Sequence, residues 1–395
     1  MNWKNARLVE VTSILGGTTP KSENSTFWNG NHIWVTPTDL GKLDTRVITD
    51  SARRITDAGL DSCGLPLVPA GAIVMSSRAP IGHLAIAGCD LHTNQGCKSF
   101  VCGEYLDSEF LFFTLQYRMA DIQTLGSGAT FVEVSKSALE NFEIVFPDIQ
   151  DQRTIAKKLT IQLAAVEEAR QAAQTQLSEI RQLKTRVLNE VFASIEGTCP
   201  LGKVARIQSG YAFKSESFKK EGVRLLRNAN ILPGKVYWTN SVFIASDDAG
   251  NYPAYSLNAG DVLISLDRPI ISTGIKVARV MPSDLPALLV QRVGRFQIDK
   301  NRLNPDYLFA FLQTQAFIDT ISGHEQSLGV PHISPGQIEA VEIPLPDIET
   351  QKRLAVVLTE IAQSAHDAQA AAEAQLQDIE LLPSRLLAQV FDAPD

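Results

Sequence analysis

The sequence has few of the residues from which catalytic and metal sites are built. It contains 5 cysteines and 6 histidines among 395 residues, and no two cysteines form a CxxC pair. Zinc sites and disulfide frameworks need closely spaced or evenly numbered cysteines, so we expect neither, and no metal or catalytic residue. The motifs GK[ST], GxSxG and HExxH are absent. Also absent are tetrapeptides of the Asn-Pro-Pro-Phe type, with which adenine methyltransferases hold a flipped base.

Long apolar runs are missing as well. No stretch of about 18 or more uncharged apolar residues occurs, and the opening MNWKNARLVEVTS lacks the basic and then apolar order of a secretory signal. We therefore predict a cytoplasmic protein that makes no membrane contact. Its length allows two or three domains.

Positive charge is scarce overall but unevenly distributed. The net charge is −8. Lys and Arg number 11 against 16 Asp and Glu in residues 1–148, 7 against 5 in 149–192, 15 against 15 in 193–347 and 3 against 8 in 348–395. A local basic face can bind phosphates even on an anionic protein. Basic residues gather in three turn-like stretches: Lys214–Lys220, Arg224–Asn230 and Gln291–Arg295.

The chain contains an internal repeat. PDIQDQRTIAKKL begins at Pro147 and PDIETQKRLAVVL begins at Pro346, an offset of 346 − 147 = 199. Each copy opens a heptad pattern typical of a long helix, and the second copy carries Pro383, which predicts a kink. The first seam consists of Leu159, Leu163, Val166, Ala173, Leu177, Ile180, Val187 and Val191, with Arg170 and Lys184 at two seam positions.

Two helices with apolar seams can hide them by packing on each other as an antiparallel pair, and the alternative is that they only dimerise the protein. The segment before each helix has the same order of glycine-ended strand, polar loop, β pair, short helix and last strand. The short helices are expected at Asp107–Leu125 and Pro305–Ile321.

We therefore predict an α+β fold with a pseudo-two-fold internal repeat, in which two similar β-rich globular domains are separated by two long antiparallel coiled-coil helices. The predicted parts are a first globular domain, a central helix, a second globular domain and a C-terminal helix, at residues 1–146, 147–197, 198–345 and 346–395. Similar frameworks with different loops favour one kind of task performed on two targets.

These features together resemble the DNA-specificity subunit of type I restriction-modification systems over essentially the whole chain. The resemblance rests on SILGGTTPKSENSTFWNGNHIWVTPTDL, on the GDVLIS run at Gly260–Ser265, and on the two PDI-xx-Q helix openings whose helices end in VF. Each piece alone is common, but the combination is specific.

The resemblance implies that the two globular domains are target-recognition domains, each of which reads one half of a split double-stranded DNA site. It also implies that the two long helices are spacer helices, which hold the domains apart and dock methyltransferase subunits. Half-sites on one face of DNA lie about one turn, roughly 34–36 Å, apart. Two methyltransferase subunits and a nuclease-translocase subunit would supply the S-adenosylmethionine, ATP and Mg chemistry. This chain would hold no cofactor and would not be an enzyme.

Polar and basic loop residues are the candidates for DNA contact, because Arg can grip guanine, Asn or Gln can grip adenine, and Lys more often meets phosphate. Arg78, Arg227 and Arg268 rank first, since each stands where a strand ends at a turn. The first domain contributes Thr18, Thr19, Lys21, Ser22, Thr36, Thr38, Arg78, Asn94, Gln95, Lys98, Ser135 and Lys136. The second contributes Lys214, Ser215, Lys219, Lys220, Arg227, Asn228, Asn230, Arg268, Gln291, Arg292, Arg295 and His332.

Two other classes of protein remain open at this stage. One is a nucleic-acid enzyme, which the missing motifs disfavour. The other is a coiled-coil assembly scaffold whose two domains bind protein or carbohydrate.

Overall fold

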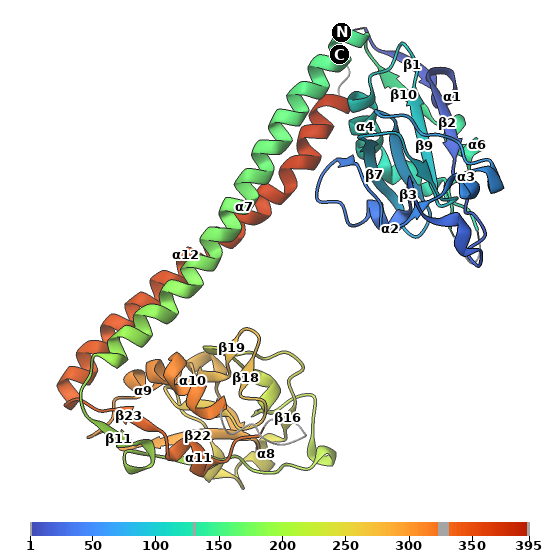
Figure 1. The fold of residues 1–395 in the computed structure, drawn as a ribbon. Coiled ribbons are helices and arrows are strands. Elements are labelled where there is room, and N and C mark those ends of the chain that lie inside the picture. The colour runs from blue at the N-terminus through green and yellow to red at the C-terminus, as the bar shows by residue number, and fades with distance from the viewer. Residues whose placement is uncertain (1, 129–131, 323–331, 393–395) are drawn as a thin grey trace. The chain divides into compact units, whose positions relative to one another are not determined.

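The computed structural model in Figure 1 describes residues 2–128, 132–322 and 332–392. Contacts divide the chain into two units, Met1–Ala172 with Gln375–Asp395, and Ala173–Ala374. Each unit contains one β-rich head and a part of both long helices. We call residues 2–146 the first head and residues 198–345 the second head. The loops predicted before the last strand of each head lie partly outside the described residues.

The first head is built on a five-stranded sheet in the order β2-β9-β6-β7-β4 and a three-stranded sheet in the order β5-β3-β8. Its central strand β6 reads IVMSS and is buried throughout. Ile73 and Met75 face a core that includes the helices of this head, and Val74 faces the opposite core, as the two-residue period of a strand requires. The strands are β1 (Lys4–Arg7), β2 (Thr12–Gly16), β3 (Trp28–Val35), β4 (Val47–Ile48), β5 (Arg54–Ile55), β6 (Ile73–Ser77), β7 (Ile81–Ala87), β8 (His92–Thr93), β9 (Cys97–Cys102) and β10 (Glu143–Phe146).

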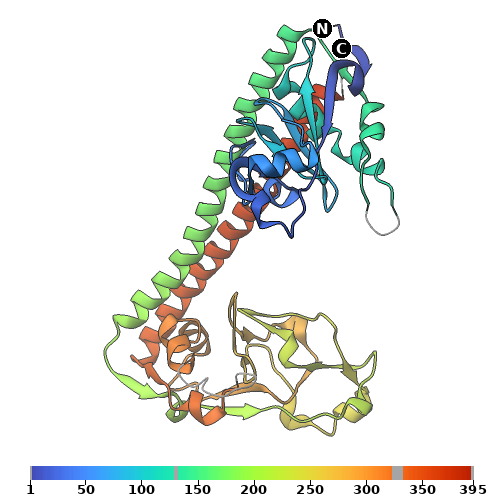
Figure 2. The ribbon, with the colours of Figure 1, turned by 45° about the vertical axis from the view of Figure 1, so that its right-hand side comes forward.

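Short helices cover this head. The helix predicted from residue 107 to residue 125 forms as two, because the chain turns at Arg118, which ends α4 and caps α5. Figure 2 shows the head from a second side. The helices are α1 (Leu8–Val11), α2 (Pro37–Leu40), α3 (Asp57–Cys63), α4 (Ser108–Tyr117), α5 (Met119–Thr124) and α6 (Lys136–Glu140).

The second head repeats this plan with a four-stranded sheet in the order β12-β22-β17-β20 and a three-stranded sheet in the order β16-β13-β21. Its central strand β17 reads VLIS and is again fully buried, with Leu263 facing one core and Val262 and Ile264 the other. The elements of the sheets are β12 (Ala205–Ser209), β13 (Val223–Leu226), β16 (Phe243–Ile244), β17 (Val262–Ser265), β20 (Val277–Arg279), β21 (Ala287–Leu289) and β22 (Val293–Ile298).

Smaller elements complete the second head. The predicted helix from residue 305 to residue 321 is also split, into α9 (Pro305–Phe311) and α10 (Gln315–Ser322). Strand β11 (Thr198–Pro200) pairs with β23 (Glu342–Pro344), as β1 pairs with β10 in the first head. The remaining elements are β14 (Ile231–Leu232), β15 (Lys235–Val236), β18 (Ile270–Ile271), β19 (Gly274–Ile275), α8 (Ser246–Ala249) and α11 (Pro335–Glu339).

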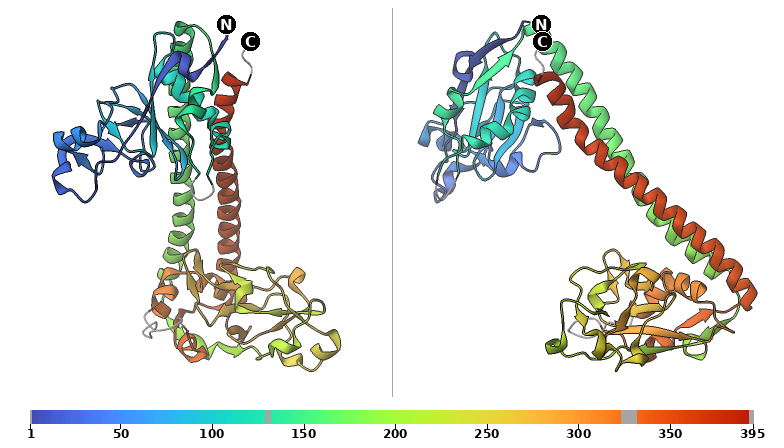
Figure 3. Two further views of the ribbon diagram at one scale, coloured as in Figure 1. Left: turned by 90° about the vertical axis from the view of Figure 1, so that its right-hand side faces the viewer. Right: turned by 180° about the vertical axis from the view of Figure 1, so that it is seen from behind.

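The long helices α7 (Ile149–Ala193) and α12 (Ile348–Phe391) lie side by side in antiparallel order in both units (Figure 3). The predicted seam of α7 is confirmed, because every seam residue from Leu159 to Val191 is buried or half-buried, Arg170 and Lys184 included. The pairing within one chain is also confirmed, which removes dimerisation as the reason for the seam. Helix α12 continues through Pro383, and a kink there stays a prediction.

The ends of the helices enter the cores of the heads. Phe192, near the end of α7, lies 4.9 Å from Tyr307 and 5.5 Å from Phe311 between ring centroids. Phe391, its counterpart at offset 199, lies 5.6 Å from Phe110 and stacks on Tyr117 at 5.3 Å. The second helix therefore returns to the first head, and each head is completed by residues from both helices.

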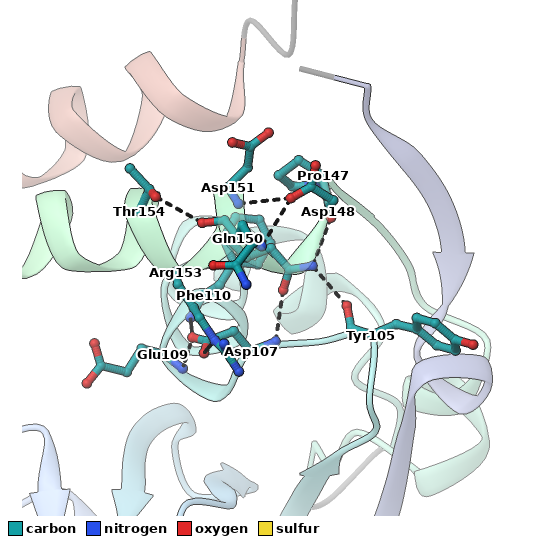
Figure 4. Close-up of polar contacts among 11 residues, drawn as sticks. Tyr105, Asp107, Glu109, Phe110, Pro147, Asp148, Gln150, Asp151, Arg153 and Thr154 are labelled. Atoms are coloured by element: carbon teal, nitrogen blue, oxygen red, sulfur yellow. Dashed lines mark hydrogen bonds and ion pairs between the residues drawn. The ribbon is translucent and has the colours of Figure 1, made fainter.

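The repeated helix opening has a repeated physical purpose. Gln152 is fully buried. Its Oε1 accepts from the Asp107 amide at 2.8 Å, while its Nε2 donates to the carbonyls of Tyr105 at 2.9 Å and Pro147 at 2.8 Å. Figure 4 shows Tyr105, Asp107 and Pro147 converging on this first helical turn, with Asp148 capping it.

Gln351 makes the same three bonds in the second head. It accepts from the Asn304 amide at 2.9 Å and donates to the carbonyls of Arg302 at 3.0 Å and Pro346 at 2.8 Å. A buried amide needs all its partners satisfied. The recurring Gln thus fastens each long helix to the loop that starts α4 or α9, which explains the repeated PDI-xx-Q.

Candidate nucleic-acid interface

Four chain reversals meet at one edge of the first head. The Thr18 amide donates to the Thr93 carbonyl at 3.0 Å, and the Ser77 amide donates to the Gly96 carbonyl at 2.8 Å. Gly17 crosses so close to the carbonyl of Asn94 that a Cβ would not fit. We call the side chains that these reversals bring together the first rim: Thr19, Arg78, Asn94, Gln95, Lys98 and Glu133.

Lys98 holds the centre of the first rim. Its side chain is only 10% exposed, and its ammonium donates to the Ser77 hydroxyl at 3.2 Å, the Gln95 carbonyl at 3.3 Å and the Glu133 carboxylate at 3.1 Å. These three bonds hold the buried ammonium in one position at the centre of the rim. Beside it, burial raises the pKa of the Cys97 thiol to about 12, so this thiol stays protonated.

The other members surround this centre. The Thr19 hydroxyl bonds to the Gln95 side chain, and Asn94 Oδ1 accepts from the Gly96 amide at 2.9 Å. A Cβ placed on Gly96 would lie 3.2 Å from Arg78 Nε and 3.0 Å from Pro37, so Arg78 and the start of α2 both lie against this turn. The structure thus brings Thr19 and Arg78, from elsewhere in the sequence, next to Asn94, Gln95 and Lys98.

The other first-head candidates have different surroundings. The Thr36 hydroxyl is used in capping α2, bonding to Asp39 at 2.6 Å, whereas Thr38 is exposed. Ser135 caps α6, and Lys136 pairs with Glu140 at 3.6 Å. Lys21 and Ser22 are exposed on the loop before β3. Of these, none has a side-chain bond to the first rim among the described contacts.

The second head gathers equivalent reversals at one edge. The Tyr211 amide donates to the Leu289 carbonyl at 3.0 Å. Gly210 lies so close to the carbonyl of Val290 that a Cβ would not fit, just as Gly17 lies against the carbonyl of Asn94. Asn228 Oδ1 accepts from Lys276 Nζ at 2.6 Å and from the Ser265 hydroxyl. The residues that line this edge form the second rim: Tyr211, Asn228, Asp267, Arg268, Lys276, Gln291, Arg292 and His332.

Charges at the second rim are also paired. Arg292 Nη1 lies 2.9 Å from Asp267 Oδ2, and Asp267 forms an isolated antiparallel bridge with His332. Burial lowers the pKa of Lys276, an effect that Asp267 partly opposes. Arg268 is exposed, and its φ of +47° places it in a tight turn. Gln291 is exposed beside it, so this rim presents two arginines and an amide to solvent.

Two of the candidate residues have side chains that bond within the head. Asn230 is fully buried, and its amide accepts from Arg227 N at 3.1 Å and donates to the Tyr237 carbonyl at 3.0 Å. Arg295 lies in β22 with its guanidinium bonded to the carbonyls of Ser256 at 2.7 Å and Ala254 at 2.9 Å. Both side chains support loops from inside the head, and their contact with DNA stays a prediction.

The remaining candidates of the second head lie outside the rim. Lys214, Ser215, Lys219 and Lys220 are exposed on one loop, which is held to β16 by the Lys219 amide bond to Phe243 at 2.9 Å. Arg227 donates to the Asn240 carbonyl. These residues form a basic border next to the three-stranded sheet.

Sequence reasoning missed an aromatic group at the second rim. Tyr211 is 38% exposed, and its ring lies 4.9 Å from Phe213, 4.8 Å from Tyr252 and 5.4 Å from Tyr255. It also missed Glu133, Asp267 and Lys276, because the predicted contacts were limited to polar and basic residues expected on exposed loops. The offset of 199 that aligns Glu133 with His332 was the available signal.

The described residues contain neither a metal-binding cluster nor a membrane-spanning helix. Within residues 2–128, 132–322 and 332–392, no group of three or more His, Cys, Asp or Glu side chains could hold a metal ion. In the same ranges no helix is long and apolar enough to cross a bilayer.

Two similar heads, each with a polar and cation-bearing rim, and the paired helices define a two-headed protein built on an internal repeat. A family model described as the type I restriction modification DNA specificity domain matches residues 1–174 and 196–377. The chain therefore belongs to the family of type I restriction-modification specificity subunits.

Individual relatives agree with this assignment. The specificity subunit of the type I restriction enzyme EcoAI from Escherichia coli is 43% identical over 168 residues, which is 42% of this chain and 28% of that protein. The MjaVIII specificity subunit from Methanocaldococcus jannaschii is 30% identical over 271 residues, 65% of this chain and 64% of that protein. The aligned part spans less than two thirds of either relative.

Solved structures support the fold. A chain reported under "Structural basis underlying complex assembly and conformational transition of the type I R-M system" has a TM-score of 0.76 at 19% identity, covering 98% of this chain and 97% of that one. The HsdS subunit from Thermoanaerobacter tengcongensis has a TM-score of 0.64 at 19% identity, covering 98% and 96%. The predicted α+β fold with two heads and two paired helices is confirmed.

Proposed function

We propose that this specificity subunit reads a bipartite double-stranded DNA site, with one half contacted by the first rim and the other by the second rim. The observation that carries the proposal is a repeated framework with unlike rims. Gly17 and Gly210 make the same crossing, yet Thr18 follows one and Tyr211 the other. A protein that reads two different half-sites needs this combination of constant support and variable contact.

The side chains at the rims suit base and phosphate contact. Arg268 and Gln291 on the second head, and Arg78 and Gln95 on the first, carry the planar donors and acceptors that can pair with base edges in the major groove. Exposed lysines such as Lys214 and Lys220 carry charges suited to phosphates, which position a protein on DNA without reading its sequence. An anionic protein can bind DNA through such local clusters.

In the same proposal the paired helices hold the heads apart and dock two methyltransferase subunits, and a nuclease-translocase subunit joins them. Those partners supply the S-adenosylmethionine, ATP and Mg chemistry. This chain binds no cofactor itself and catalyses no reaction. The buried Gln152 and Gln351 support a spacing role, because each fastens a helix end to its head through three hydrogen bonds.

The test is to produce the chain with its methyltransferase partner and map methylated adenines in the DNA of the host cell. A split motif is expected, in which exchanging the second head for that of another specificity subunit changes one half alone. Inserting matched heptads into α7 and α12 should lengthen the gap. An unsplit motif or an unchanged gap contradicts the proposal. Failure to retain DNA, with both heads folded, would favour an assembly scaffold with other ligands.

A further inference from the structure

The first rim contains a carboxylate that faces two cations. Glu133 Oε1 lies 3.1 Å from the Lys98 ammonium, and Glu133 Oε2 lies 3.7 Å from Arg78 Nη1. The Glu133 and Arg78 side chains are 35% and 32% exposed, so the group is half open to solvent. Two of the cations predicted to meet DNA thus share one of the protein's own carboxylates.

The backbone fixes this carboxylate in position. Glu133 and Ser127 exchange two amide-to-carbonyl bonds at 3.1 Å, and the next amide, of Val134, donates to the Ser77 carbonyl at 3.0 Å. Arg78 and Glu133 form an isolated antiparallel bridge. Glu133 is therefore held across from Arg78 by the fold, and its position does not depend on the ion pair alone.

The second head has an equivalent bridge, in which the carboxylate stands on the opposite side. His332 stands at the place of Glu133, since 133 + 199 = 332, and it bridges to Asp267, which occupies the place of Arg78. Asp267 then binds Arg292 at 2.9 Å and has a side chain only 13% exposed. Each rim thus holds one internal carboxylate among its cations, contributed by opposite sides of an equivalent bridge.

We propose that Glu133 and Asp267 are specificity-determining residues, which restrain the cations of each rim from binding DNA phosphates at non-target sequences. This inference rests on the function proposed above. Free cations bind phosphates of any sequence with release of counterions. At a non-target sequence the rim cations can meet only phosphates, and the fixed carboxylate competes with that contact. At the target an arginine can donate to a base edge through N–H groups that its carboxylate leaves free, so the carboxylate weakens non-target binding more than target binding.

The test compares the complex of this chain with its methyltransferase partner, carrying either the natural chain or the variant Glu133→Gln. Affinities for a target duplex and a non-target duplex are measured over a series of salt concentrations. In the variant, non-target affinity should rise severalfold. The slope of log affinity against log salt should steepen by about 0.9 for each additional phosphate that the protein neutralises, and the ratio of target to non-target affinity should fall. Asp267→Asn should act in the same direction.

Matched variants separate this effect from a general change of charge. Glu143→Gln removes one negative charge from the same head at β10, where Glu143 bonds to Asn5 at 3.2 Å, and should leave the affinity ratio unchanged. Adding Arg78→Gln to Glu133→Gln should reverse most of the rise in non-target affinity, because Arg78 is the freed cation.

The outcomes distinguish the two proposals. If the natural complex prefers its target and Glu133→Gln leaves non-target affinity and salt slope unchanged, or lowers both affinities alike, the inference is overturned while the proposed function stands. If the natural complex shows no preference between the duplexes, the proposed function is overturned and the inference falls with it.

Discussion

The two heads share a skeleton but differ in the chemistry of their rims. Both place a fully buried strand between two cores, both cross a glycine against a neighbouring carbonyl, and both fasten a long helix with a buried Gln. The first rim is built around a charged group with Lys98 at its centre, whereas the second adds the Tyr211 ring cluster. The glycine crossings and the helix-bonding Gln stay constant between the heads, while the side chains at the rims diverge.

Disrupting the close backbone contact that a glycine makes in each head should have the largest effect on stability. Gly17→Ala and Gly210→Ala would each drive a Cβ into backbone carbonyl atoms that cannot move aside. We expect each to destabilise its own head by about 3 kcal/mol or more, at the upper end of overpacking. Gly16→Ala is the control, because no heavy atom lies within 4 Å of a Cβ there. Hydrogen exchange of each head checks this result, and equal protection in Gly16→Ala and Gly17→Ala would refute it.

Removing the buried Gln that bonds each long helix to its head should lower the stability of both heads alike. Gln152→Ala leaves the buried Asp107 amide and the Pro147 carbonyl without this partner, and Gln351→Ala does the same to Asn304 and Pro346. The expected loss is about 1–3 kcal/mol for each. Chemical denaturation measures it, with the exposed Gln150→Ala as the control. A loss confined to one head would show that the two openings are not equivalent.

Truncating an arginine at each rim should sharpen the difference between the heads. Arg268 is exposed at a turn, while Arg78 is paired with Glu133 at 3.7 Å. Arg268→Ala should therefore cost about 1–3 kcal/mol of target binding and relax the preference at one base pair, and Arg78→Ala should cost less. Methylation mapping and duplex affinity provide the measurement. Arg302→Ala, which removes a cation bonded to the Lys203 carbonyl, is the control. A larger loss for Arg78→Ala would reverse the expected order.

The smallest predicted difference concerns pH. His92 in β8 stands where the second head has Leu288, and burial holds the pKa of His92 below its ordinary value of 6.5, with His32 adding to the effect. The unfolded chain therefore takes up a proton first. As pH falls through 6.5, the free energy of unfolding of the first head should decrease through this residue.

The check is hydrogen exchange of the first head above and below that pH, in the natural chain and in His92→Leu. The variant should show a weaker dependence on pH. An unaltered dependence would mean that other groups of this head carry it.

Much of the architecture was accessible from the sequence, because it is written in local and periodic signals. The heptad of α7 and the offset of 199 predicted the seam, the pairing and the repeat. The split of α4 from α5 at Arg118 was missed, since an unbroken amphipathic pattern spans the turn.

The rims were harder to predict. Glu133 meets Lys98 across 35 residues, and Arg292 meets Asp267 across 25, so their pairing is set by strand register and not by spacing in the sequence. The burial of Asn230 and Arg295 could not be predicted for the same reason, because it depends on loops that return from elsewhere in the chain. Side-chain partners of this kind become visible only when the sheets are assembled.

The packing of Phe391 against Phe110 has a consequence for the order in which the protein is made. The second head receives Phe192 from a helix that leaves the ribosome before it, whereas the first head must wait for the final helical turns before its hydrophobic centre is filled. The core of the domain translated first is thus the last to be completed.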